Sequence, residues 1–176
     1  MSEAVTAPTA SEDRLREIEA RLRLLEDDRA IRQLITSYPA ALDSGKSRFA
    51  AGLFADGGVY DFKASEESED GVSEGLLDQQ GIVDLLEHSV HQRIIGEGAA
   101  HTHGPAFIDI SGDTAVATNY SVVFRRIGMS VALYRVSANR WELVRTPGGW
   151  RVLKKVTRVL DGSAEPRDLL GQAIDD

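Results

Sequence analysis

Apolar residues follow a helical period in the first part of the chain and an alternating period in the second. Between Ser11 and Leu42 they recur at intervals of three and four positions, which is the spacing of one face of an amphipathic helix. The phase of this stripe changes near Ala30, and Pro39 lies inside its second part, so we expect a kink or two successive helices rather than one straight rod. From Ala99 onward the period is two, and glycine-containing turns separate the runs. The pattern predicts helices first and an antiparallel meander afterwards.

The later elements follow from the same two periods. They are a short helix from Ser47, a strand over Val59–Phe62, a helix over residues 78–96, and strands over Phe107–Ser111, Ala115–Arg126, Val131–Thr146 and Trp150–Leu160. Helices followed by hairpins indicate an α+β domain whose helices pack on one face of a curved sheet. We expect such a sheet to leave a conical cavity at its open end.

The chain divides into four parts by composition. Residues 1–10 are small and polar and are expected to have no fixed structure, residues 11–29 form a helical arm, residues 30–162 form the main domain, and residues 163–176 form a C-terminal tail. Within the main domain, residues 64–75 carry acidic side chains and no base, which predicts a solvated loop beside the cavity. Whether this loop closes over the cavity is left open.

Composition excludes several classes of protein. The 176 residues contain no cysteine, which excludes disulfides, thiolate catalysis and cysteine-ligated zinc. The formal net charge of −8 argues against nucleic acid as a partner. No apolar run is long enough to span a membrane and the first residues lack a leader pattern, so we expect a cytoplasmic protein without a membrane partner. No dinucleotide or phosphate-binding motif occurs, and no cofactor is expected.

Basic residues are concentrated in the last strands. The stretch from Arg125 to Arg158 holds nine bases and one acid, Glu142. We interpret most of them as the solvated face of long strands, with Lys and Arg at the sheet edges. They are Arg125, Arg126, Arg135, Arg140, Arg145, Arg151, Lys154, Lys155 and Arg158.

Two histidines mark the start of the sheet. His101 and His103 lie two positions apart in an extended segment, so both side chains are expected on the same face. Such a pair could bind a metal, but Phe107 stands near the position where a glutamate ligand would follow, and no metal site is expected. His88 and His91 are expected on the outer face of their helix.

Asp43 ends the apolar helical stripe that also contains Tyr38. Its carboxylate could cap the following Ser44–Gly45 turn. It could instead point into the cavity, orient an imidazole and make that imidazole a general base. The residues alone leave both interpretations open.

The order of these motifs resembles the SnoaL-like branch of the nuclear-transport-factor-2-like superfamily. The resemblance covers about residues 25–162. It rests on Leu25–Leu34, Tyr38–Gly45, Leu53–Asp56, His101 followed by Ile108–Ala115, and Asn139–Val152.

This resemblance implies a cone-shaped, cystatin-like α+β barrel with one deep apolar pocket. In the scytalone dehydratase and dehydrochlorinase members, an Asp at the position of Asp43 and a His at the position of His101 form a catalytic dyad. Tyr38 and Tyr60 resemble pocket tyrosines that steer a leaving oxygen. Arg145 resembles an arginine that some dehalogenating members place near the leaving group.

The resulting hypothesis is a cofactor-independent lyase or isomerase, similar to dehydratases and polyketide cyclases. Its substrate would be small and apolar, and cyclic or polyketide-like molecules fit this class. His101 removes a proton, Asp43 holds the imidazolium, and Tyr38 binds the departing or enolising oxygen. Substrate contacts are assigned to Tyr60, His103, Asn119 and Arg145, with Asn119 rather than its neighbour Tyr120 facing the cavity.

An alternative hypothesis is a non-catalytic ligand-binding or assembly module on the same fold. We expect a homo-oligomer, either a dimer or a trimer, formed through the outer face of the sheet. The apolar stripe from Leu15 to Leu25 could join a neighbouring subunit or lie across its own sheet.

Overall fold

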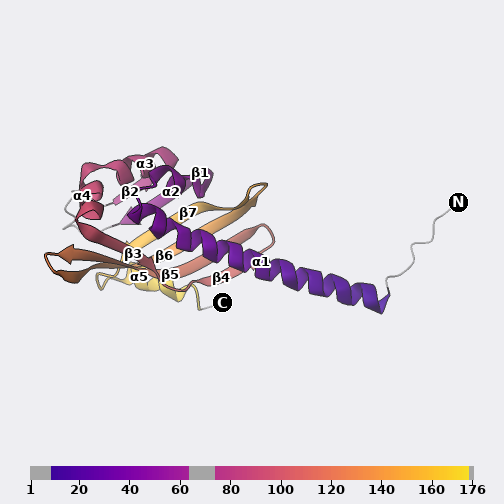
Figure 1. The fold of residues 1–176 in the computed structure, drawn as a ribbon. Coiled ribbons are helices and arrows are strands. Elements are labelled where there is room, and N and C mark those ends of the chain that lie inside the picture. Colours follow the sequence, from indigo (N-terminus) through magenta and orange to yellow (C-terminus); the bar gives the residue numbers. More distant parts are fainter. Residues whose placement is uncertain (1–8, 64–73, 175–176) are drawn as a thin grey trace.

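Helix α1 (Ala10–Asp43) is the longest element, and its first half projects away from the rest of the molecule (Figure 1). The computed structural model describes residues 9–63 and 74–174. A capping box starts the helix, because the Thr9 hydroxyl accepts the Glu12 N–H while the Glu12 carboxylate accepts the Thr9 N–H. The expectation of two successive helices is wrong, since one helix of 34 residues runs through Pro39. Burial of the neighbouring side chains in the core offsets the one backbone bond that Pro39 cannot donate.

The remaining helices are short and gather at one end of the molecule or on the sheet. They are α2 (Ser47–Gly52), α3 (Gln79–Glu87), α4 (Ser89–Gly98) and α5 (Ala164–Gly171). Helix α5 lies within the segment expected to be a tail, where Pro166 and Leu169 are buried. Residues 1–8 and 64–73 lie outside the described part, and with them most of the expected N-terminal and acidic loop segments.

The strands of the described residues form one curved, open, seven-stranded sheet (Figure 1). Its path is β2-β1-β7-β6-β5-β3, with β4 also paired to β5; β1 and β7 run parallel and the other pairs antiparallel. The bounds are β1 (Phe54–Lys63), β2 (Glu74–Leu77), β3 (Ala99–His103), β4 (Phe107–Ser111), β5 (Thr114–Ile127), β6 (Ser130–Thr146) and β7 (Gly149–Val159). The predicted α+β architecture is confirmed.

The core lies between the second half of α1 and the concave face of the sheet. Ile31, Ile35 and Tyr38 of α1 meet Trp141 and Leu143 of β6, and all five are at most 3% exposed. A Trp and a run of branched side chains bury enough apolar surface to hold the helix on the sheet. This packing positions the C-terminal end of α1, and therefore Asp43, beside β3.

A β-bulge divides β7 into two halves. Leu143 pairs with Val152, and the next residue of β6, Glu142, pairs with Lys154, so Leu153 is an extra residue on β7. A bulge shifts the alternation of side chains along the strand that carries it. Val152 is therefore buried before the bulge, and Lys155 is buried after it.

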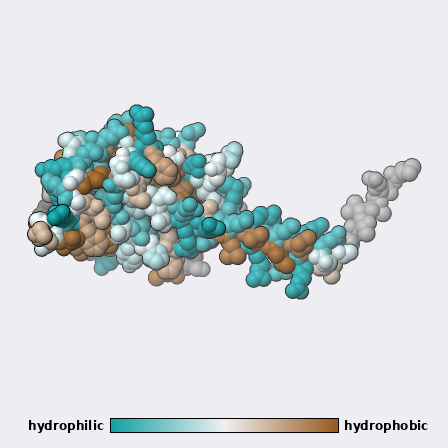
Figure 2. All heavy atoms as spheres, viewed as in Figure 1, coloured by the Kyte–Doolittle hydropathy of each residue, from teal (hydrophilic) through white to brown (hydrophobic). Residues whose placement is uncertain are grey.

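The projecting part of α1 carries an exposed apolar stripe, which Figure 2 shows as brown patches along the helix. Its members are each more than half exposed: Leu15, Ile18, Leu22, Leu24 and Leu25. The stripe does not lie across its own sheet (Figure 1). Within the described residues, no helix combines the length and apolarity that crossing a membrane requires.

Candidate functional site

A cavity of about 120 Å³ lies between α1, α3, α4 and the concave face of the sheet. Apolar side chains cover the helical side and polar side chains come mainly from β3, β6 and β7. The lining includes Tyr38, Leu42, Tyr60, Phe62, Ile82, Leu86, His91, His101, His103, Arg135, Ser137, Asn139, Lys155 and Thr157. A few polar groups converging on an apolar pocket are typical of a small-molecule site.

His101 and Asp43 meet at the edge of this cavity. The ring Nδ1 of His101 lies 2.6 Å from one carboxylate oxygen of Asp43, and the backbone N–H of His101 donates to the other oxygen at 2.8 Å. The carboxylate therefore holds the same residue at two points. Asp43 is the last residue of α1, and His101 lies within β3. Both residues are therefore held by regular secondary structure and not by a loop.

This contact sets the tautomer of the imidazole. A carboxylate accepts at Nδ1, so a neutral His101 carries its proton on Nδ1 and leaves a lone pair on Nε2. The His101 side chain is 13% exposed and that of Asp43 is 27% exposed, which limits the water that competes for the bond. The arrangement can take up a proton at Nε2 and stabilise the cation that results.

His103 faces the same cavity, as the alternation of β3 predicts. Its ring packs against Tyr38 and Trp141, with centroid distances of 6.2 and 5.5 Å. Burial is the main cause that lowers the pKa of His103 to about 3. The described residues offer no hydrogen-bond partner to its buried Nδ1. His103 is therefore a neutral side chain of the cavity wall.

Tyr38 and Tyr60 both line the cavity. Burial raises the pKa of each phenol, so both are neutral hydrogen-bond donors at physiological pH. Tyr38 packs edge-on against Trp141, with ring centroids 5.6 Å apart, and Tyr60 stacks on Phe62 at 5.2 Å. The two tyrosines therefore border the cavity from α1 and β1.

Asn119 is buried but does not line the cavity. Its amide nitrogen donates to the carbonyl of Gly104 at 3.2 Å, and its oxygen accepts the indole N–H of Trp141 at 3.1 Å. Asn119 rather than Tyr120 is on the buried side of β5, but both ends of its side chain bind protein groups and not the cavity. Asn119 therefore supports the wall behind the cavity.

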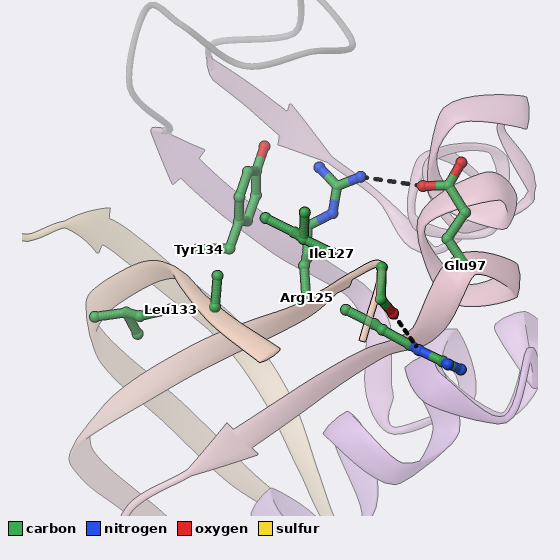
Figure 3. A pocket seen from close by; sticks show the side chains of 8 residues that line it. Glu97, Arg125, Ile127, Leu133 and Tyr134 are labelled. Carbon is green, nitrogen blue, oxygen red and sulfur yellow. Dashed lines mark hydrogen bonds and ion pairs between the residues drawn. The ribbon is translucent and has the colours of Figure 1, made fainter. Parts of the chain in front are cut away.

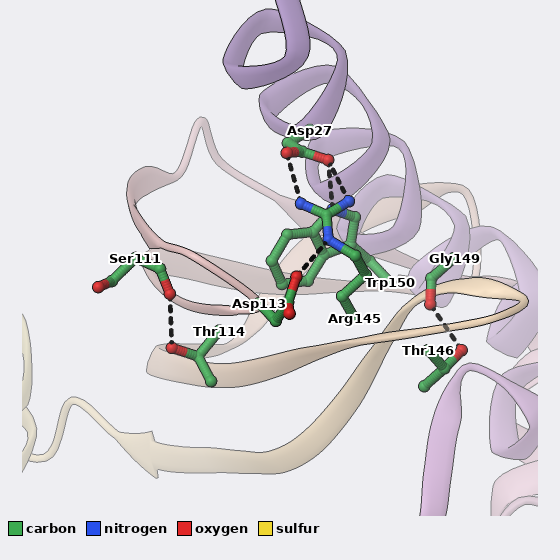
Figure 4. Close-up of polar contacts among 8 residues, drawn as sticks. All are labelled: Asp27, Ser111, Asp113, Thr114, Arg145, Thr146, Gly149 and Trp150. Atoms are coloured by element: carbon green, nitrogen blue, oxygen red, sulfur yellow. Dashed lines mark hydrogen bonds and ion pairs between the residues drawn. The ribbon is translucent and has the colours of Figure 1, made fainter. Parts of the chain in front are cut away.

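Arg145 lies at the junction of the sheet with α1 (Figure 4), and it is not among the residues that line the cavity. Its guanidinium donates two bonds to Asp27, at 2.7 and 2.6 Å, and a third to Asp113 at 2.9 Å. The indole N–H of Trp150 donates to the same Asp27 carboxylate at 2.9 Å. This cluster fastens the helix to the sheet, and Arg145 does not line the site.

His91 lies on the cavity wall, so the expectation that it faces outward is wrong. Its ring centroid is 6.0 Å from that of His101. One helix was expected here, but the backbone is extended at His88, and a new helix starts at Ser89. The break changes the helical phase and turns His91 inward.

Lys155 is a second cavity residue that the sequence did not indicate. Most bases of this stretch were expected on a solvated face, but Lys155 is 2% exposed. Its Nζ lies 5.1, 4.3 and 4.9 Å from the ring centroids of Tyr38, Tyr60 and Trp141. Its neighbour Lys154 does reach outward, to Asp61 at 3.4 Å. The bulge at Leu153 produces this reversal.

A larger open groove of about 610 Å³ lies at the far end of the β5–β6 hairpin (Figure 3). Arg125 pairs there with Glu97 at 3.3 Å, and Arg126 donates to the carbonyl of Gly128 at 2.9 Å. Its charged groups thus bind protein atoms, whereas the inner cavity gathers histidines, tyrosines and a buried amine. The inner cavity is the better candidate site.

In the part of the chain that the structure describes, no three His, Asp or Glu side chains lie close enough together to hold a metal ion. The Nδ1 of His101 is engaged by Asp43. The buried Nδ1 of His103 has no hydrogen-bond partner within the described residues.

Comparisons with known proteins agree with this architecture. A family profile described as SnoaL-like domain matches residues 23–156. An NTF2-like protein with a cystatin-like fold from Novosphingobium aromaticivorans is 39% identical; the match covers 89% of this chain and 96% of that one, with a TM-score of 0.80.

Two more distant structures show the same fold. Aln2 from a Streptomyces species is 18% identical, with 82% of this chain and 93% of that chain covered and a TM-score of 0.60. The β subunit of a proposed aromatic-ring-hydroxylating dioxygenase from N. aromaticivorans is 20% identical, with 78% and 91% covered and a TM-score of 0.60. Among curated proteins there is no match.

Proposed function

Since the chain belongs to the family of SnoaL-like domains, we propose that it is a cofactor-independent lyase or isomerase that uses His101 as a general base and Asp43 as its orienting carboxylate. The observation that carries the proposal is the two-point contact between them, at 2.6 Å to the ring and 2.8 Å to the backbone. A carboxylate that only capped a turn would not need to meet an imidazole. The geometry is that of a base held in one tautomer.

The reaction begins when Nε2 of His101 removes a proton from a carbon next to a carbonyl or a leaving group. The positive charge then formed on the imidazole is stabilised by the Asp43 carboxylate. Tyr38, kept neutral by its raised pKa, donates a hydrogen bond to the enolising or departing oxygen. Because positioned acid–base groups contribute about 10²–10⁴-fold, the substrate must carry an already acidified proton.

The cavity and the family support the proposed substrate class. A volume of about 120 Å³ with an apolar helical wall suits a small, largely apolar molecule of a single ring. Membership of the SnoaL-like family supports small-molecule binding, and the resemblance to its dehydratase and cyclase members supports a reaction of that type. Tyr60 and His103 contribute the remaining contacts of the wall.

The decisive variant is Asp43→Asn. A carboxamide has one acceptor oxygen, whereas Asp43 accepts two N–H groups of His101 on two separate oxygens. The amide NH₂ therefore either opposes one of these donors or donates to Nδ1 and moves the proton to Nε2, which removes the base. We expect the rate to fall by about 10²–10⁴-fold.

Activity and the tautomer of His101 both test this expectation. Loss of water from 3-hydroxycyclohexanone gives a conjugated enone that absorbs in the ultraviolet, and exchange of the α-protons of cyclohexanone in D₂O is followed by NMR. Long-range proton–nitrogen spectra report the His101 tautomer without any substrate. Glu19→Gln, which removes a carboxylate from the exposed arm of the same helix, is the control and should change neither signal. An Nε2–H tautomer in the unmodified protein would contradict the mechanism.

A second candidate, a non-catalytic binding or assembly module, is favoured by the exposed stripe on α1. An apolar helix face of this length is typical of a surface that a second chain covers. A fold neighbour named as a dioxygenase β subunit supports the idea that this fold can serve as a subunit. We keep a homo-oligomer, dimer or trimer, as part of the proposal, and enone formation separates catalysis from binding alone.

A further inference from the structure

The cavity contains a buried amine that the proposed reaction does not use. Lys155 is 2% exposed and lines the cavity together with His101. Within residues 9–63 and 74–174 no carboxylate lies in ion-pair distance of its Nζ, in contrast to Lys154, which meets Asp61 at 3.4 Å. A buried lysine without an acid is costly, because charged groups lose their hydration.

The hydrogen bonds around Lys155 leave one position on nitrogen open. Its Nζ donates to the Thr157 hydroxyl oxygen at 2.5 Å and to the Asn139 side-chain oxygen at 3.3 Å. The Thr157 hydroxyl donates its own proton to the side-chain oxygen of Asn139, at 2.8 Å, so it can only accept from Lys155. Two N–H groups are thus engaged, and a neutral amine keeps its lone pair as the fourth position.

Burial and a neighbouring cation oppose the charged form of Lys155. Burial and then the positive charge of Arg135 hold the pKa of Lys155 well below its ordinary value. Arg135 also lines the cavity. Desolvation in an apolar pocket and a neighbouring cation are the two conditions that convert lysine into a nucleophile at neutral pH.

We propose that Lys155 is a nucleophilic amine that forms an imine with the carbonyl carbon of an aldehyde or ketone bound in the cavity. The Nζ lone pair attacks the carbonyl carbon, the C=O π electrons move to oxygen, and one of the two amine protons is transferred to that oxygen to give a neutral carbinolamine. The carbinolamine then loses its hydroxyl together with an amine proton as water, which leaves a C=N bond. No oxidant, reductant or metal enters the balance.

The imine needs Lys155 alone, so it does not depend on the Asp43–His101 pair. A further consequence rests on the proposed function: protonation of the imine draws electrons from the adjacent carbon and acidifies its hydrogen, which His101 then removes. That role would supply the acidified proton that general-base catalysis requires. The substrate class is thereby narrowed to aldehydes and ketones.

Reductive trapping tests the proposal. The full chain is incubated at neutral pH with benzaldehyde and treated with sodium borohydride, which reduces an imine to a stable benzyl amine that mass spectrometry detects. The chain has only four lysines: Lys46, Lys63, Lys154 and Lys155. We expect Lys155 to be labelled at least about tenfold faster than each of the others, because each unit of lowered pKa raises the neutral fraction tenfold.

Variants separate this result from surface labelling. Lys154→Met, one position away on the same strand, should keep the label, and Lys155→Met should lose it. Asp43→Asn should keep the label as well, so a failed dyad and a failed imine give different results. Peptide mapping of the unmodified protein decides the question even if Lys155→Met does not fold. Labelling of Lys154 at or above the rate of Lys155, or no label on Lys155, would overturn the proposal.

Discussion

Acidification should destabilise the protein through His103 in particular. The native pKa of this histidine is lowered to about 3 from the ordinary 6.5, mainly because the ring is buried. In the unfolded chain His103 therefore binds a proton near pH 6.5, whereas in the native state it binds one only near pH 3. The stability from a neutral His103 is complete above pH 6.5 and is lost as the pH falls toward 3.

The size of the effect follows from these two values. Between pH 7 and pH 5 the unfolded form gains about 2 kcal/mol relative to the native form from this one site, at 1.36 kcal/mol per pKa unit. The change is insensitive to the native pKa as long as that value stays below 4. His103→Phe keeps a ring against Tyr38 and Trp141 and removes the titration.

Urea unfolding at the two pH values measures the effect. The unmodified protein should lose about 2 kcal/mol more than His103→Phe on going from pH 7 to pH 5, since other titrating groups contribute equally to both proteins. An equal loss in both proteins would refute the reasoning, because it would mean that His103 is hydrated or has a partner in the native state.

Two further predictions concern α1: its contact with the sheet, and its exposed apolar stripe. Asp27→Ala should lower the free energy of unfolding, measured by chemical denaturation, by about 1–3 kcal/mol, because Arg145 and the Trp150 N–H lose their common acceptor. The control is Asp28→Ala, which breaks only an exposed pair with Arg32 and should change the free energy of unfolding by less than about 1 kcal/mol. If the stripe joins subunits, Ile18→Asp combined with Leu22→Asp should lower the molar mass measured by light scattering. An oligomer of unchanged molar mass would indicate that the subunits associate through the outer face of the sheet instead.

Much of the site was predictable, because local periods decide it. The alternation of β3 sets His101 and His103 on one face, and the apolar stripe of α1 places Asp43 at the buried end of a helix. Their meeting across 58 positions could be expected only from the family resemblance, since nothing local specifies which helix end faces which strand. The continuity of α1 was missed because core packing outweighs the cost of one internal proline.

The residues that were missed follow irregularities of the backbone. His91 depends on the extended conformation at His88, and Lys155 depends on the bulge at Leu153. Both irregularities change the phase of side chains without a glycine or proline at the break. A strict alternation from Val152 would have put Lys154 inside.

The bulge also makes β7 tolerant of a change in length. Trp150 and Val152 before it and Lys155 and Thr157 after it are held by their own partners on β6. Deleting Leu153 would restore regular pairing and leave all four side chains facing as they do now. In distant homologues a one-residue gap is thus to be expected here, and an alignment that forbids it would assign the wrong lysine to the interior.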